Sequence, residues 1–352
     1  MDGKRENYKW ELLALLCLAF FINQGDRAIF GVVLPSIKSE LQLTDTQLGM
    51  VGSVLFFTLA VMLPIAGYLG DLWNKKWIII CSLLFWSAAT LTTGLAGGLA
   101  GLVLLRSVAT AGGESFYAPA AFPLLAEHHT RTRSLALGVH QAALYVGVMT
   151  SGFMGRLIAD RWGWRSAFYV FGGCGILLGL ISIWRLRDTA VDSMRRPSAL
   201  GASRPATGAA WKVFFLTKTA LFLTVGCAAI VFVNNAYVVW APEFVREKYG
   251  LSQAAAGGCS MFYHHAAALA GVVAGGRLTD RRVAACPDFR LRLMGRAMLL
   301  GVPAIACVGL APGLVLTCLA MAVFGLFRGL YEANTHAALF DVIAPCYRAS
   351  AV

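Results

Sequence analysis

Long apolar runs, separated by short polar stretches, dominate the pattern along this chain. Ten of the runs reach about 20 residues, the length that crosses a lipid bilayer as a helix. They lie near residues 10–36, 46–70, 77–97, 101–125, 134–159, 164–186, 212–240, 253–276, 294–311 and 314–343. The pattern predicts an all-α polytopic membrane protein.

One long polar interval divides the runs into six and four. It is rich in Arg, Pro, Ser and Gly and shows neither helical nor strand periodicity, which is typical of a linker. We therefore predict a six-helix N-terminal bundle (1–187), a cytoplasmic linker (188–211) and a partial C-terminal bundle of four helices (212–352).

Composition supports a membrane protein, because 58% of the 352 residues are hydrophobic and only 14% are charged, against about 25% charged in soluble domains. The net charge of +12 comes from basic residues between the runs and not from a stripe, so we expect no nucleic-acid partner. Most of these residues fall in loops on one side of the predicted topology. The positive-inside rule then predicts a multi-pass protein of the plasma (inner) membrane with both termini and the linker cytoplasmic.

Motifs of enzymes and metal sites are missing from the sequence. The nine cysteines include no C-x-x-C pair, and we find no P-loop, dinucleotide fingerprint, nucleophile elbow or H-E-x-x-H motif. His264 and His265 have no acid beside them in the sequence. We expect no enzyme, no catalytic residue, no cofactor and no metal.

A loop motif occurs twice, at residues 67–76 and 276–282. In each copy a glycine precedes an aspartate by four residues, so the two share a helix face, and basic residues follow. The glycine allows a neighbouring backbone to approach the carboxylate. The predicted gating residues are Gly67, Asp71, Lys75, Lys76, Gly276, Asp280, Arg281 and, at the start of the fifth run, Arg133. A generic positive-inside turn would explain the basic residues but not the repeated spacing.

This repeated motif resembles the G-x-L-x-D-R-x-G-R-[RK] signature of the major facilitator superfamily, with Leu72 and Asn74 in place of Arg and Gly. The resemblance implies two bundles of six helices, with the first motif docking on the eleventh helix and the second on the fifth. Residues 347–352 repeat the start of the fifth run, at 131–138, so we expect the last two helices to be lacking. On this basis Asp280 finds its partner near Arg133, and Asp71 lacks its docking surface.

Charges also occur inside predicted spans, where they cost about 3 kcal/mol or more unless they face a polar interior. Asp26 and Arg27 interrupt the first run, and Arg106 and Glu114 the fourth. A buried acid with a movable cationic partner can load and release a proton, so Asp26 and Glu114 are candidate proton-coupling residues. Alternatively, Asp26 and Arg27 lie near the far interface and neutralise each other.

The first and fourth runs resemble spinster-like transporters, on the residues Asn23, Asp26, Arg27, Arg106, Glu114 and Tyr117. The resemblance implies that the acids serve coupling and the arginine binds the substrate head group. Arg106 and Glu114 are eight residues apart, one more than in that family. On a regular helix, at about 100° per residue, this spacing turns the arginine well off the face of the acid.

The tenth run contains a polar span, residues 328–336, that resembles the organic anion:cation symporter branch of the same superfamily. That branch takes up small carboxylates and sugar acids. Arg328 and Glu332 are four residues apart and could instead pair with each other. The predicted substrate-binding residues are Arg27, Arg106, Tyr117, His140, Tyr145, Asn234, Arg328, Glu332 and Asn334.

Together these features predict a monomeric secondary transporter that moves an organic anion with protons by alternating access. Its expected partners are a small organic solute, protons and the lipid bilayer. Two alternatives remain at this point: export of a lysolipid-like molecule, and a receptor or scaffold that binds without transport.

Overall fold

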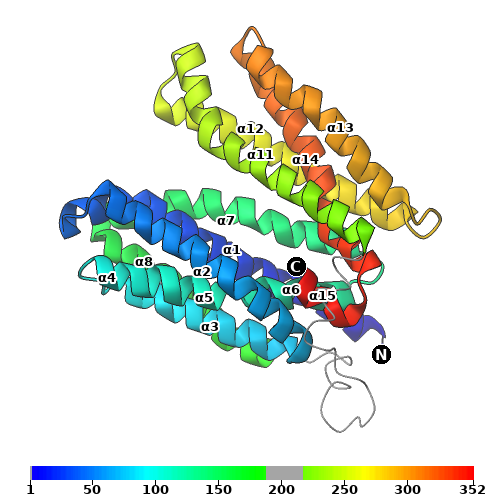
Figure 1. Ribbon diagram of the computed structural model, residues 1–352, viewed down its shortest axis with the longest axis horizontal. Coiled ribbons are helices and arrows are strands. Elements are labelled where there is room, and N and C mark those ends of the chain that lie inside the picture. Colours follow the sequence, from blue (N-terminus) through cyan, green and yellow to red (C-terminus); the bar gives the residue numbers. More distant parts are fainter. Residues whose placement is uncertain (1, 188–216) are drawn as a thin grey trace. The chain divides into compact units, whose positions relative to one another are not determined.

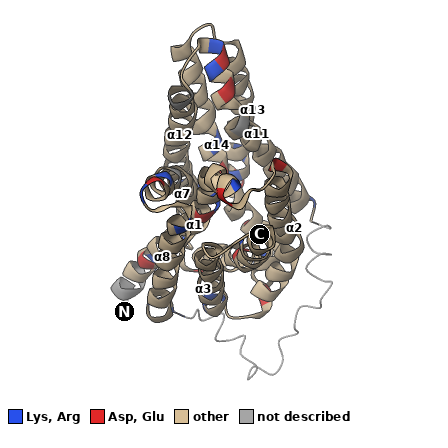
Figure 2. Cartoon of the chain, turned by 90° about the vertical axis from the view of Figure 1, so that its left-hand side faces the viewer, with Lys and Arg blue, Asp and Glu red and all other residues tan. Residues whose placement is uncertain are grey.

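The computed structural model describes residues 2–187 and 217–352, and these contain helices and no strand (Figure 1). The predicted linker at 188–211 lies outside the described residues. Eight of the described helices are long and apolar enough to cross a membrane. Charged residues are sparse along them (Figure 2). These findings agree with an all-α polytopic membrane protein.

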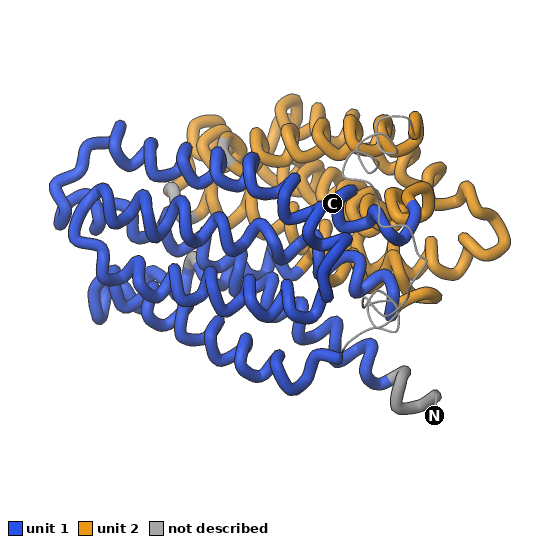
Figure 3. The backbone as a smooth tube through the Cα atoms, turned by 60° about the horizontal axis from the view of Figure 1, so that its bottom comes forward, with its two compact units in different colours: residues 1–128, 143–210, 344–352 blue, residues 129–142, 211–343 orange. Residues whose placement is uncertain are grey.

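Two compact units make up the chain (Figure 3). Unit 1 comprises residues 1–128, 143–210 and 344–352, and unit 2 comprises 129–142 and 211–343. Unit 1 contains α1 (Asp2–Leu41), α2 (Asp45–Leu72), α3 (Lys75–Thr93) and α8 (Trp164–Arg185). The helix α7 (Arg133–Trp162) runs from unit 2 into unit 1.

The fourth apolar run does not form one regular helix. It is divided into α4 (Leu99–Leu102), a π-helix η1 (Val103–Ala109), α5 (Thr110–Glu114) and α6 (Tyr117–His128). Gly113 permits its close approach to α3, since a Cβ there would lie 2.7 Å from the Phe85 ring. The break places polar side chains of this run inside unit 1.

Unit 2 contains α11 (Lys218–Tyr249), α12 (Gln253–Arg282), α13 (Phe289–Leu310) and α14 (Leu314–Val342). A short 3₁₀ turn, η2 (Pro345–Tyr347), and α15 (Arg348–Ala351) follow and belong to unit 1. The eighth predicted run forms α12, which is long enough to span a bilayer but is not among the eight apolar spans.

Glycines bring α12 and α14 into backbone contact. A Cβ on Gly329 would lie 2.0 Å from the carbonyl oxygen of Ala268, and one on Gly325 would lie 2.1 Å from that of His264. Small residues that allow backbones to approach closely are a common basis of helix packing in membranes. This contact fixes where His264 lies along the helix axis relative to the polar residues of α14.

Gly329→Ala is expected to destabilise the chain by about 1–3 kcal/mol, the usual cost of overpacking, because the clash is with backbone that cannot rotate away. Unfolding by dodecyl sulfate in mixed micelles measures the effect. The matched control is Gly258→Ala, on the same pair of helices, where a Cβ meets nothing within 4 Å. Equal stability of the two variants would contradict the close-contact interpretation.

Candidate functional site

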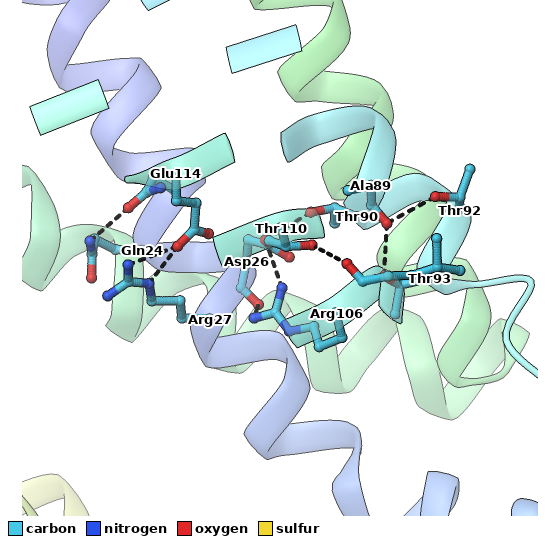
Figure 4. A network of polar contacts seen from close by, with 12 residues as sticks. Gln24, Asp26, Arg27, Ala89, Thr90, Thr92, Thr93, Arg106, Thr110 and Glu114 are labelled. Atoms are coloured by element: carbon cyan, nitrogen blue, oxygen red, sulfur yellow. Dashed lines mark hydrogen bonds and ion pairs between the residues drawn. The ribbon is translucent and has the colours of Figure 1, made fainter. Parts of the chain in front are cut away.

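Two ion pairs link α1 to the broken fourth segment inside unit 1 (Figure 4). Arg106 Nη1 lies 2.8 Å from Asp26 Oδ2, and Arg27 Nη2 lies 2.7 Å from Glu114 Oε2. Two adjacent residues of α1 are therefore paired with the fourth segment. The acid Asp26 pairs with Arg106, and the base Arg27 pairs with Glu114. The alternative in which Asp26 and Arg27 neutralise each other is wrong.

The Asp26–Arg106 pair is the more enclosed of the two, because both side chains are 1% exposed. Thr90 donates a further hydrogen bond of 2.8 Å to Asp26 Oδ2, and Arg106 Nη2 donates one of 3.0 Å to the Asp26 carbonyl oxygen. The guanidinium also lies over the Phe30 ring. Charges removed from water to this extent are tolerated when paired and hydrogen-bonded.

The Arg27–Glu114 pair differs in its exposure. Glu114 is 1% exposed at its side chain, whereas Arg27 is 34% exposed. Arg27 also donates from Nε to Glu114 Oε2 at 2.8 Å, so two of its nitrogens bind one carboxylate oxygen. Of the four charged residues in this network, Arg27 is thus the one that is partly exposed, and it binds the buried Glu114 from that side.

One oxygen of each carboxylate, Asp26 Oδ1 and Glu114 Oε1, is buried without a hydrogen-bond partner among the described residues. Unpaired buried oxygens are uncommon because they lose their hydration without compensation. Each acid therefore has one oxygen bound by an arginine and one buried oxygen with no hydrogen-bond partner among the described residues.

The π-helix η1 explains how Arg106 reaches this network despite its spacing from Glu114. A π-turn accommodates one extra residue within a helix, and Thr110 Oγ1 donates to the Leu105 carbonyl five residues back within it. The prediction that eight residues turn Arg106 off the face of Glu114 assumed a regular α-helix, which residues 103–109 do not form. Arg106 joins the network through Asp26 and not through Glu114.

Tyr117 contributes to packing around this network. Its hydroxyl donates a 2.6 Å hydrogen bond to the Leu16 carbonyl oxygen, and its ring stacks on Phe20 and meets Trp86 edge-on. Asn23 is 3% exposed and accepts a hydrogen bond from Gln24. Tyr145, on the unit 1 part of α7, is 4% exposed. The predicted roles of Tyr117 and Tyr145 in binding solute remain predictions.

The first loop motif docks on the turn formed by residues 348–351. Asp71 accepts hydrogen bonds of 2.8 and 2.9 Å from the backbone amides of Ala349 and Ser350, and a short one from the Ser350 hydroxyl. A Cβ on Gly67 would lie 2.9 Å from Ser350 Cα. The expectation that Asp71 lacks a docking surface was therefore wrong, since α15 supplies one.

The second loop motif repeats this geometry in unit 2. Asp280 accepts hydrogen bonds of 3.0 and 2.9 Å from the amides of Ser134 and Leu135, at the start of α7. A Cβ on Gly276 would lie 2.6 Å from Leu135 Cα. The predicted partner of Asp280 near Arg133 is thus confirmed, as is the reason for glycine at this spacing. A carboxylate at a helix N-terminus is stabilised by the unpaired amides and the helix dipole.

Further charge pairs surround each motif. Lys75 lies 3.2 Å from Glu127 in unit 1, and Lys76 lies over the Trp77 ring. In unit 2, Asp341 binds both Arg133, at 2.9 Å, and Arg290. Arg281 is exposed.

Sequence reasoning missed Arg290 and Asp341 of this second group. The second motif has Ala284 and Ala285 where the first has Lys75 and Lys76, and Arg290 on α13 carries the buried positive charge instead. Comparing the starts of the third and ninth runs, rather than the motifs alone, would have found it.

The polar span of the tenth run lies on α14 in unit 2. Arg328 Nη2 is 3.3 Å from Glu332 Oε2, which confirms the alternative that these residues pair with each other. Arg328 Nη1 also lies 3.0 Å from His264 Nε2 on α12, a partner that sequence reasoning did not assign. Asn334 donates to the Leu330 carbonyl oxygen, and His140 is fully buried on α7.

A pocket in unit 2 is lined by residues of α7, α11 and α14, among them Gln141, Asn234, Arg328 and Glu332. The described residues contain no group of acids, histidines and cysteines that could hold a metal ion. The predicted binding residues thus fall into one set in unit 1 and one in unit 2.

Comparisons with known proteins agree with this geometry. The family model "Major Facilitator Superfamily" matches residues 16–352. Human "Protein spinster homolog 1" is 28% identical over 238 residues, which cover 66% of this chain and 45% of that protein. The "Probable sulfoacetate transporter SauU" of Cupriavidus necator is 29% identical over 251 residues, 68% of this chain and 57% of that protein. The chain thus spans about half the length of these curated relatives.

Among solved structures, a bacterial homologue of the human lysosomal transporter Spinster, inward-facing and unoccupied, superposes with a TM-score of 0.63. It is 23% identical, and the match covers 98% of this chain and 78% of that one. Such a likeness supports the fold, and the relatives above support the spinster-like resemblance of the sequence.

Proposed function

Because this chain belongs to the major facilitator superfamily, a family of membrane transporters and not of enzymes, we propose that it is a secondary transporter that moves a small organic anion together with protons. The observation that carries the proposal is the network of Figure 4, in which Glu114 and Asp26 are buried beside arginines and each keeps an unpaired oxygen. Buried acids in membrane helices mark proton and solute pathways.

The coupling follows from competition for Arg27. While Glu114 is ionised, it holds the Arg27 guanidinium through two contacts. Protonation of Glu114 removes the negative charge that holds Arg27, so that Arg27 can bind the anionic group of a solute. A proton and an anion are then favoured together, which makes the transporter a symporter. Asp26 holds Arg106 in the enclosed pair behind, and we assign to it a second, less accessible protonation step.

The nature of the solute rests on the arginines. Arg27 in unit 1 and Arg328 in unit 2 are cations positioned beside acids that can exchange for a solute anion. The named substrate of one relative, sulfoacetate, is a small organic anion of this type. We therefore propose sulfoacetate as the first test solute. The orientation with cytoplasmic termini, the inner-membrane location and the monomeric state remain predictions of the basic-residue pattern and the family.

The test is uptake of labelled sulfoacetate into proteoliposomes containing the full chain. We expect an inward proton gradient to drive accumulation above equilibrium, and a protonophore to abolish it. Glu114→Gln should lose the gradient-driven part and keep solute exchange at zero gradient. The control is Asp160→Asn, whose ion pair with Arg156 is exposed. Accumulation in Glu114→Gln equal to that of the unmodified chain would refute coupling through Glu114.

The same preparation separates the alternatives. Binding of sulfoacetate without exchange across the bilayer would favour a receptor. Transfer of a lysophospholipid between the leaflets, without uptake of sulfoacetate, would favour a lipid exporter.

A further inference from the structure

Arg328 meets both a histidine and a carboxylate in unit 2. Its Nη1 meets His264 Nε2 at 3.0 Å, and its Nη2 meets Glu332 Oε2 at 3.3 Å. Because a guanidinium can only donate, Nε2 must accept, and His264 is neutral with its proton on Nδ1. That Nδ1 is buried.

The His264 contact is held rigidly. The imidazole ring packs against the Tyr237 ring, at 4.4 Å between centroids, and the Phe324 ring, at 5.2 Å, and these two rings also contact each other. His264 is fully buried, and its own backbone is held against Gly325 of α14. His264 therefore sets the position of the Arg328 guanidinium.

The Glu332 contact is the looser of the two. Its 3.3 Å distance exceeds the usual 2.7–2.9 Å of a charge-assisted hydrogen bond. The Glu332 side chain is 16% exposed, against 7% for that of Arg328. Both residues line the pocket of unit 2, into which the Asn234 side chain also faces with a buried oxygen that has no partner among the described residues.

We propose that Glu332 is an internal substitute for the anionic group of the solute: a carboxylate or sulfonate replaces it on Arg328 Nη2 while His264 holds Nη1. The exchange keeps the guanidinium, the more buried of the two charges, paired at every stage. Glu332 then lowers the affinity for anions and His264 is a positioning residue. The proposal rests on the proposed function in one respect, that a solute anion enters this pocket.

Cys227 allows this to be tested without transport, because it lines the same pocket and is partly exposed. The measurement is the rate at which Cys227 in the purified full chain reacts with an anionic and with a cationic methanethiosulfonate reagent, followed by peptide mass spectrometry. Cys307, exposed on α13, is the internal reference within every sample.

Glu332→Gln keeps the side-chain shape and removes one negative charge near Cys227. We expect the ratio of anionic to cationic reaction rates at Cys227 to rise about tenfold, as a unit charge at short range in a partly buried site implies, while the ratio at Cys307 is unchanged. Sulfoacetate should protect Cys227, and at a lower concentration in Glu332→Gln than in the unmodified chain. Arg328→Gln should abolish protection.

The positioning role of His264 has its own variants. His264→Gln keeps an acceptor for Arg328 and should retain most of the protection, whereas His264→Leu should require at least tenfold more sulfoacetate. A reaction rate at the buried Cys318 that stays as low as in the unmodified chain shows that a variant is folded. Equal protection in His264→Leu and His264→Gln would overturn the positioning role.

Two test anions distinguish whether the group that binds Arg328 belongs to a free organic acid or to a lipid. Protection by sulfoacetate indicates a free organic acid, and protection only by lysophosphatidic acid indicates a lipid head group; both support the exchange. Protection by neither, or a rate ratio unaltered in Glu332→Gln, overturns it. The Cys227 measurement uses no proton gradient, so it is independent of the uptake experiment. If Cys227 is protected but proton-driven uptake is absent, the coupling mechanism is rejected and the exchange at Arg328 is still supported.

Discussion

Arg106→Ala is expected to destabilise the chain by about 3–5 kcal/mol, the typical cost of removing one partner from a buried ion pair. Among the described residues, the Asp26 carboxylate, 1% exposed, would keep only the hydrogen bond from Thr90. Because the Arg106 guanidinium also binds the Asp26 carbonyl oxygen, the local geometry of α1 loses a second contact. Unfolding by dodecyl sulfate in mixed micelles gives the change in free energy.

A double-mutant cycle of Asp26→Asn and Arg106→Gln, measured singly and together, separates the pair from general packing. Asp26→Asn combined with Arg106→Gln removes both charges, and the double variant should be more stable than Arg106→Ala. The exposed pair Arg156–Asp160 on α7 provides the control, since Arg156→Ala should cost less than about 1 kcal/mol. If Arg106→Ala were no more destabilising than Arg156→Ala, the Asp26–Arg106 pair could not be a buried anchor of α1.

Asp71→Ala is expected to release the turn at residues 348–351. The carboxylate accepts two backbone amides and one hydroxyl from this turn, and hydrogen bonds to a charged group contribute about 1.5–3 kcal/mol each. Amide hydrogen exchange in the peptide containing Ala349 and Ser350 should therefore accelerate at least about tenfold, as a loss of 1.4 kcal/mol or more implies.

The second motif provides the parallel experiment. Asp280→Ala should accelerate exchange at Ser134 and Leu135, whose amides it binds. The exposed Asp288, paired with Arg292 on α13, is the control acid, and Asp288→Ala should leave both peptides unchanged. Exchange at 349–350 that does not respond to Asp71→Ala would mean that the turn is held by other contacts.

The membrane-spanning character of the chain could be predicted because it depends on composition over long windows. The glycine to aspartate spacing also predicted a true contact, since Gly276 and Asp280 meet the start of α7 as expected. The prediction for Asp71 failed for a different reason. It assumed that docking needs a whole eleventh helix, whereas the carboxylate needs only two free amides, and α15 provides these.

The candidate site was predicted in its members but not in its pairing. Asp26, Arg27, Arg106 and Glu114 were recognised because charges inside apolar runs are costly. Their partners depend on the π-helix at 103–109, and one extra residue within a helix has no clear signature in composition. The pairing of His264 with Arg328 was not predicted, because it comes from the contact of α12 with α14. Sequence spacing indicates only which residues are neighbours on the same helix.

The central claim is that an anion and a proton move together because Glu114 and the solute compete for Arg27. The most direct measurement is the reverse of gradient-driven uptake: sulfoacetate is added outside proteoliposomes with no imposed pH gradient and with the voltage clamped, and a trapped dye reports the internal pH. The account predicts that sulfoacetate entry acidifies the interior in the unmodified chain and does not in Glu114→Gln. Entry without acidification in the unmodified chain, or equal acidification in both, would contradict it.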